Sequence, residues 1–166
     1  KGIGVISWEF ITQLPSRMGK EGGISSTIIG TLYLTVVAVI ISTPLGIGAA
    51  VYLTEYQKRN SRFTRLVEAS AEALAGIPSI IFGLFGFIFF VIYLQLGWSI
   101  LSGGLTLAIM ILPTIIRTTQ EALSAVPKEF RENSLALGAT KWQTTSRVVL
   151  PSAAPGIMSG VILSIG

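Results

Sequence analysis

The sequence predicts an all-α, polytopic membrane protein, a bundle of about four transmembrane helices with a helical cytoplasmic loop. Two observations predict this fold class. Apolar residues make up 51% of the 166 residues and charged residues only 12%, whereas soluble domains average about 25% charged residues. The charges are also clustered, since none occurs between Glu21 and Glu55, between Glu72 and Arg117, or after Arg147.

Each uncharged stretch has the length of one or two membrane spans. A bilayer core about 30 Å thick needs roughly 20 apolar residues as a helix, so the first and last stretches each provide one span. The middle stretch would make a single helix about 66 Å long, which requires two spans joined as a hairpin. We therefore expect helices at about Ser26–Leu53, Ala75–Leu96, Leu105–Ile116 and from Val148 onward, with the hairpin turn at Gly97–Gly104.

The distribution of lysine and arginine predicts the orientation. Of the 12 basic residues, four lie in Glu55–Glu68 and five in Arg117–Arg147, whereas the hairpin turn has none. Cytoplasmic loops are enriched in basic residues, so both charged loops are expected inside and the turn outside. Residues 1–25 then form an extracytoplasmic segment and residues 26–166 the transmembrane domain. Because that segment is too polar to span a membrane, we expect at least one further helix upstream.

The composition also argues against several classes of function. The chain has no cysteine and no histidine, and all eight acidic residues are glutamate, so the usual metal ligands and the Ser-His and Cys-His catalytic pairs are missing. No phosphate-binding Gly-Lys-[Ser/Thr] loop occurs, because Gly19-Lys20 is followed by Glu21. We therefore expect no cofactor, no metal and no enzymatic activity, although a Ser-Lys arrangement stays open. The net charge of +4 follows from the cytoplasmic loops and does not indicate nucleic-acid binding.

The second charged loop, at about residues 119–147, is predicted to form two helices separated by a sharp turn. Pro127 suits the first turn of a helix, where its missing N–H has no partner to lose. Gly138 is expected to end this helix at positive φ. Thr140 is then placed to cap a second helix that continues into the membrane.

The first of these helices presents apolar side chains to a partner. Phe130, Ser134 and Leu137 share one face, and Lys128 and Glu132 are spaced to pair across one turn. An apolar helix of this kind fits a groove on another protein. The alternative is an amphipathic helix that lies on lipid headgroups; the motif described next favours docking.

A spaced motif runs through this loop. Glu132-Asn133-Ser134 precedes Gly138 by three residues, and nine residues then separate Gly138 from Val148-Val149-Leu150-Pro151. This resembles the pattern Glu-Ala-Ala, three residues, Gly, nine residues, Ile, one residue, Leu-Pro in the permease subunits of bacterial ABC importers. Asn133 and Ser134 replace the two alanines but remain small. The resemblance implies docking to an ATP-binding subunit dimer through Phe130, Glu132, Ser134, Leu137, Gly138, Leu150 and Pro151.

Other stretches resemble the PstA-type permeases of phosphate-specific importers, which have the MetI-like fold. These are Gly30–Thr35, Pro44–Gly46, Val51–Tyr56, Leu74–Ser79, Gly83–Gly86, Leu105–Ala108, Leu112–Arg117 and Glu121–Leu123. The resemblance implies a multi-pass subunit of the inner (cytoplasmic) membrane that pairs with a PstC-type permease and receives inorganic phosphate from an extracytoplasmic binding protein. A PstC-type subunit, a permease for another oxyanion and a non-transport membrane scaffold stay open as alternatives.

Substrate contacts are expected in sequence beyond Gly166, where the family continues with an Arg-Ala-Ile-Gly-Glu-Thr stretch. A buried charge in a bilayer is costly and is usually functional. Within this chain, prolines inside spans either permit rocking or merely shape packing. The glycines favour close helix packing over a role in permeation. The candidates for the translocation path or for helix packing are Pro44, Gly76, Pro78, Ser79, Gly83 and Pro113.

Overall fold

The computed structural model describes residues 15–16, 21–22, 24–57 and 62–165. In this part of the chain, β1 (Pro15–Ser16) pairs antiparallel with β2 (Glu21–Gly22), and the remaining secondary structure is helical. Most of the predicted extracytoplasmic segment, and residues 58–61 of the first charged loop, lie outside the described residues. The all-α prediction is confirmed.

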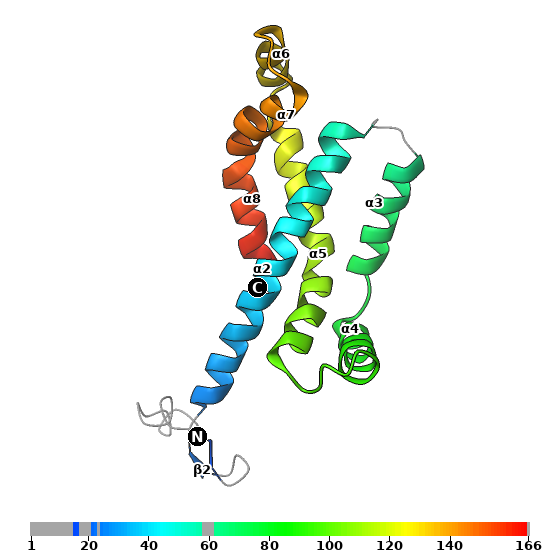
Figure 1. Cartoon of the computed structure of the whole chain (residues 1–166), viewed down its shortest axis with the longest axis vertical. Helices are drawn as coiled ribbons and strands as arrows, with labels where there is room; N and C mark the ends of the chain where they lie inside the picture. The colour runs from blue at the N-terminus through cyan, green and yellow to red at the C-terminus, as the bar shows by residue number, and fades with distance from the viewer. Residues whose placement is uncertain (1–14, 17–20, 23, 58–61, 166) are drawn as a thin grey trace.

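The bundle is elongated, and its long helices run along its length (Figure 1). These helices are α2 (Ser25–Val51), α5 (Ile100–Ala125) and α8 (Leu150–Ile165). The short helix α6 (Lys128–Ala136) lies at one extremity, which is called the α6 end from here on.

Helix α2 is the first predicted span, and it extends further than expected. A π-helical segment, η3 (Tyr52–Tyr56), continues α2 directly, so that one helical rod runs from Ser25 to Tyr56. Neither the first nor the last turn of α2 carries a charged residue, and the helix continues through Pro44. The first charged side chain of this rod is therefore Glu55, at the α6 end.

The second predicted span, Ala75–Leu96, is shorter than expected, because one helical rod runs from Ser79 to Tyr93. Helix α3 (Arg62–Ala75) occupies residues expected in a loop, and α4 (Ser79–Gly86) with π-helical η4 (Phe87–Tyr93) follows after a bend of 99°. The bend falls at Pro78, whose backbone is extended with ψ 137° and which cannot donate a backbone hydrogen bond. Pro78 thus sets the start of this span at Ser79, four residues after the predicted start at Ala75.

The turn of the hairpin is also shorter than predicted. Gly103 and Gly104 lie inside α5, and the predicted span Leu105–Ile116 is only its middle part. Positive φ values at Gln95 (53°) and Gly97 (65°) reverse the chain. Ser99 and Ser102 then form a capping box that starts the helix, a signal that outweighs the two glycines.

The last helical rod begins before Val148. Helix α7 (Lys141–Thr144), π-helical η5 (Thr145–Val149) and α8 follow one another without interruption, so the rod runs from Lys141 to Ile165. Pro151 is the second residue of α8, and its missing N–H leaves the carbonyl group of Arg147 in η5 without the usual donor four residues later.

Close contacts at glycines join the long helices. A methyl group at Gly46 would lie 2.6 Å from Cγ2 of Ile115, and one at Gly104 would lie 2.5 Å from Cγ1 of Val37. A methyl at Gly160 of α8 would overlap Thr118 of α5. Small residues let helices approach closely where lipid supplies no hydrophobic driving force between them.

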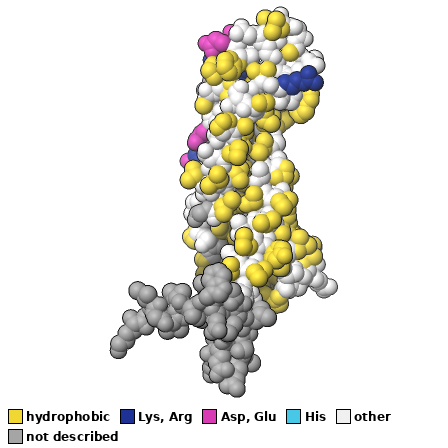
Figure 2. All heavy atoms as spheres, turned by 90° about the vertical axis from the view of Figure 1, so that its left-hand side faces the viewer, with side chains coloured by type: hydrophobic (Ala, Val, Ile, Leu, Met, Phe, Trp, Pro, Cys, Tyr) yellow, Lys and Arg dark blue, Asp and Glu magenta, His cyan; other side chains and the backbone are white. Residues whose placement is uncertain are grey.

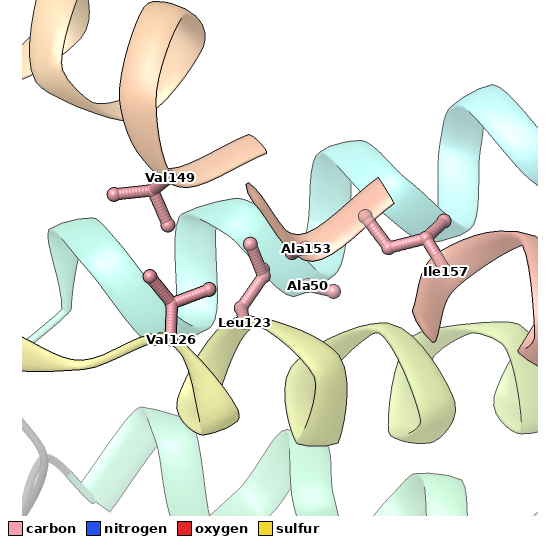
Figure 3. Packing of buried hydrophobic residues seen from close by; sticks show 6 residues of the cluster. All are labelled: Ala50, Leu123, Val126, Val149, Ala153 and Ile157. Atoms are coloured by element: carbon pink, nitrogen blue, oxygen red, sulfur yellow. The ribbon is translucent and has the colours of Figure 1, made fainter. Parts of the chain in front are cut away.

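The best-packed core lies near the α6 end. Figure 3 shows side chains from α2, α5, η5 and α8 meeting there, with Val126 at the end of α5 among them. The cluster consists of Ala50, Leu123, Val126, Val149, Ala153 and Ile157. Three long helical rods are therefore held as one packed unit near the α6 end.

Three of the described helical rods are long and apolar enough to cross a membrane: Ser25–Tyr56, Ile100–Ala125 and Lys141–Ile165. The bent pair Arg65–Ala75 and Ser79–Tyr93 makes a fourth if it forms one broken span. On the face shown in Figure 2, hydrophobic side chains extend along the whole bundle, while the charged ones lie toward the α6 end. The expectation of about four spans is met by this arrangement.

Candidate functional site

Helix α6 is separated from α5 by a two-residue break. Val126 is extended, with ψ 125°, as expected of a residue that precedes proline. Pro127 is also extended and caps α6, so the helix begins at Lys128 and Pro127 precedes its first turn. The chain can thus change direction where it leaves the long helix α5.

The turn after α6 has the predicted geometry. Gly138 has φ +85°, and its N–H donates to the carbonyl of Leu135 at 2.9 Å. The N–H of Ala139 donates to the carbonyl of Ser134 at 3.2 Å, which completes a Schellman motif. Thr140 caps α7 and forms a capping box with Gln143. The predictions for Gly138 and Thr140 are confirmed.

Apolar side chains project from this turn without cover from the described chain. Leu137 is 89% exposed and Trp142 is 66% exposed, and Leu135 and Phe130 are each about half exposed. Ser134 does not join them: it is half-buried, and its hydroxyl lies 3.0 Å from that of buried Thr144 on α7. The predicted shared face therefore divides into an apolar tip (Phe130, Leu135, Leu137 and Trp142) and an internal hydroxyl pair.

Arg131 anchors α6 to the rest of the bundle. Its Nη2 lies 2.7 Å from Oε1 of Glu55, and its Nε donates to both carboxylate oxygens of Glu55, at 3.1 and 3.3 Å. The same guanidinium group donates to the carbonyl oxygens of Val126 and Leu123, each at 2.8 Å. One side chain thus joins α6, the end of η3 and the end of α5.

A cleft of about 790 Å³ opens beside this ion pair, between α3, α5 and α6. Glu132 lines it and is exposed, and among the described side chains the expected ion pair between Lys128 and Glu132 is not formed. Across the cleft, Arg117 lies 3.6 Å from Glu72 of α3. Glu132 is therefore free to meet a basic group on a partner.

The remaining predicted site residues lie elsewhere in the bundle. Leu150 packs against the core cluster, and Pro151 is exposed. Pro113 is buried inside α5 and Pro44 is exposed on α2, and both helices continue through their proline. The predicted docking residues therefore lie on α6 and its turn and at the start of α8.

The break between α3 and α4 collects the other candidates for the translocation path, and all of them are exposed: Gly76, Pro78, Ser79 and Gly83. A methyl group at Gly83 would meet no atom within 4 Å, whereas one at Gly86 would overlap Thr106 of α5. Within the described chain, Gly86 therefore packs closely against α5, and Gly83 does not.

The sequence did not indicate Arg131 and Glu55 as site residues. Arg131 was one of the basic residues of the second charged loop and Glu55 was part of the Val51–Tyr56 stretch, and no local spacing connects residues so far apart. Lys141 was missed in the same way: its Nζ lies 5.2 Å from the centre of the Tyr56 ring, a cation–π distance. The only sequence signal was the placement of Glu55-Tyr56 directly at the end of an uncharged span.

Comparisons with known proteins agree with this architecture. The family model described as "Binding-protein-dependent transport system inner membrane component" matches residues 42–166. The chain is 37% identical over 165 residues to the probable ABC transporter permease protein YqgI of Bacillus subtilis (strain 168), covering 99% of this chain and 56% of that protein. It is 43% identical over 144 residues to the phosphate transport system permease protein PstA of Mycobacterium leprae (strain TN), covering 87% and 47%. The chain thus spans about half the length of these curated relatives.

A solved structure has the same fold. A chain of the MetNI methionine ABC transporter, in inward facing conformations, superposes with a TM-score of 0.75 at 25% sequence identity. The match covers 83% of this chain and 66% of that one. The predicted MetI-like bundle is therefore confirmed, and the chain belongs to the family of binding-protein-dependent transport system inner membrane components.

Proposed function

We propose that this chain is part of the membrane-spanning permease subunit of an ABC importer for inorganic phosphate, without catalytic activity of its own. The apolar tip carries the proposal, because four exposed apolar side chains gather on the α6 end, beyond the long apolar rods. The family match and the phosphate permease relative support the same function. ATP hydrolysis then occurs in a separate subunit.

The apolar tip suits a protein groove better than a lipid surface. A helix that lies on a membrane presents one long apolar face parallel to it. Here α6 has only nine residues, and exposed Leu137 and Trp142 precede and follow the positive-φ Gly138 in the chain. A compact knob of this kind fits a recess on a folded partner. Exposed Glu132 beside it can meet a basic group on the same partner.

The α6 end is proposed to face the cytoplasm. It carries Lys128, Arg131, Lys141 and Arg147, whereas the opposite turn at residues 94–99 has no basic residue. Basic residues favour the cytoplasmic side of a membrane. The apolar tip is then on the side where ATP is available, and the turn around Trp98 faces outside.

The proposed transport cycle uses this arrangement. An extracytoplasmic binding protein delivers phosphate to this subunit and a related, PstC-type permease. Two ATP-binding subunits hold the two apolar tips, and their closure on ATP draws the tips together and reorients the pathway. The energy enters as the different affinity of the ATPase dimer for the two states of the permease pair.

The test uses the full-length protein, expressed with its partners in cells that lack their own phosphate permease. Leu137→Ser removes the most exposed leucine of the tip. We expect ATPase co-purification and phosphate uptake to fall about tenfold or more, because a leucine buried at an interface contributes about 1.5–3 kcal/mol. Leu101→Ser, at an exposed leucine near the outer turn, is the matched control and should change neither quantity.

Three results would contradict the proposal. Normal ATPase binding and uptake in Leu137→Ser would show that the tip is not the docking site. Uptake of sulfate or another oxyanion in place of phosphate by the unaltered protein would assign the substrate to the alternative class. A scaffold without transport would show no phosphate uptake and no bound ATPase at all.

A further inference from the structure

The guanidinium group of Arg131 makes five hydrogen bonds to three acceptor groups, one carboxylate and two backbone carbonyls. Three go to the carboxylate of Glu55, and two go to the carbonyl oxygens of Leu123 and Val126. A planar fork with several N–H donors is needed to reach these acceptors together. A lysine at this position has one ammonium group and cannot make both the paired carboxylate contact and the two carbonyl contacts.

This ion pair is shielded, unlike the other ion pair that the cleft contains. The Arg131 side chain is 20% exposed and that of Glu55 is 9% exposed. In the Arg117–Glu72 pair the side chains are 48% and 72% exposed, and the charged atoms are 3.6 Å apart. A shielded charge pair holds a fixed geometry, and breaking it leaves a charge without a partner; an exposed pair contributes little.

The acceptors belong to the packed inner ends of the long helices. Leu123 and Val126 are members of the core cluster in Figure 3, and Glu55 ends the rod that starts at Ser25. Lys141 of α7 also lies over the ring of Tyr56, next to Glu55. Displacement of α6 therefore pulls on the ends of α2–η3 and α5 through Arg131.

Two routes thus connect the apolar tip with the membrane helices. One runs through the Gly138 turn and the Ser134–Thr144 hydroxyl pair into α7 and α8. The other runs through Arg131 to Glu55 of η3, 76 residues away along the chain, and back to the end of the neighbouring helix α5. Without the second route, α6 can move with a docked partner while α2–η3 stays behind.

We infer that Arg131 and Glu55 are positioning residues that transmit the movement of the docked helix α6 to α2 and α5, so that ATP hydrolysis is coupled to transport. This inference rests on the proposed function. The pair does not contact the ATPase through the apolar tip, and it does not contact the substrate. Its loss uncouples the two processes and leaves docking in place.

The experiment uses the full-length permease pair with its ATPase and phosphate-binding protein in proteoliposomes. Arg131→Lys keeps the charge but loses the fork, and Glu55→Gln keeps the shape but loses the charge. Glu72→Gln, in the exposed ion pair, is the matched control. ATPase co-purification, ATP hydrolysis and phosphate uptake are measured together, along with the phosphate concentration that gives half-maximal uptake.

We expect Arg131→Lys and Glu55→Gln to bind the ATPase and hydrolyse ATP at close to the unaltered rate, while phosphate uptake per ATP falls about tenfold. The half-maximal phosphate concentration should not change, because neither residue contacts substrate. Glu72→Gln should keep the unaltered uptake per ATP. A purely structural role would lower hydrolysis and uptake in the same proportion.

The inference is overturned if uptake per ATP stays constant in both variants, or if neither variant inserts into the membrane. Leu137→Ser distinguishes this from failure of the proposed function. If Leu137→Ser loses the ATPase while Arg131→Lys and Glu55→Gln transport normally, docking at the tip stands and the role of the ion pair is wrong. If all three variants bind the ATPase and transport normally, the proposed function fails as well.

Discussion

The hydroxyl oxygens of Ser134 and Thr144 lie 3.0 Å apart and join helix α6 to helix α7 across the turn at Gly138. Thr144 is buried, so its hydroxyl has little access to water. The pair fixes the angle between the two helices that carry the apolar tip. The small side chain at position 134 therefore has a role inside this site, where it joins α6 to α7.

Removal of this hydroxyl pair should weaken docking without preventing insertion. Thr144→Val keeps the shape of the side chain but leaves the Ser134 hydroxyl without its partner, at a cost of about 1 kcal/mol. We expect about fivefold less ATPase to co-purify with the permease. Ser146→Ala removes a hydroxyl that bonds only the carbonyl of Trp142 in its own helix, and it should bind the ATPase normally. Equal losses in the two variants would contradict this role.

Substitution of Gly138 should act through the backbone. The space around it is open, but its φ of +85° disfavours other residues, at about 1–2 kcal/mol. Gly138→Val should insert normally yet co-purify roughly 5–30-fold less ATPase and lose phosphate uptake in proportion. Gly138→Asn should lose less, because asparagine adopts positive φ more readily.

Gly138→Ala adds only a methyl group at positive φ, and Gly48→Ala is its control. Gly48 also has open space around it, but it lies inside α2, where its φ is not positive. Only Gly138→Ala should weaken ATPase binding. If Gly138→Val binds the ATPase and transports like the unaltered protein, the turn does not position the docking surface.

Close packing between α2 and α5 should make Gly104 sensitive to a single methyl group. The methyl of Gly104→Ala would lie 2.5 Å from Cγ1 and 3.0 Å from Cβ of Val37. Overpacking of this kind costs about 1–3 kcal/mol, which thermal unfolding in detergent should show as a lower transition temperature. Val37→Ala combined with Gly104→Ala should recover part of the loss, whereas additive losses would argue against the contact. Gly30→Ala, with open space at its Cβ position, is the control.

The proposed orientation can be tested by labelling, since the chain has no native cysteine. Trp98 in the outer turn is 87% exposed, whereas Ser102 is buried in the capping box and would label poorly. Trp98→Cys should react with a membrane-impermeant maleimide in intact cells, and Leu137→Cys only after lysis. The reverse pattern would place the apolar tip outside and exclude contact with a cytoplasmic ATPase.

Much of the fold could be predicted because membrane spans have a length and a composition that are local. The uncharged stretches predicted three of the helical rods, and the Gly138 turn and Thr140 cap followed from residues whose backbone preferences are strong. The errors were also local in origin. The break at Pro78 moved the start of the second span from Ala75 to Ser79, and the Ser99 cap brought Gly103 and Gly104 into α5, although the glycines had been expected in the turn.

The sequence alone determined the fold class, the apolar character of the spans, the place of the sharp turn and the spaced motif of the second charged loop, because each depends on neighbouring residues. Only the tertiary structure decided that Arg131 meets Glu55, that Ser134 turns inward to Thr144, and that Leu137 and Trp142 are both exposed. These relationships depend on how separate helices pack. A charge or hydroxyl looks the same in the sequence whether it faces water or a partner far along the chain, and packing alone distinguishes the two.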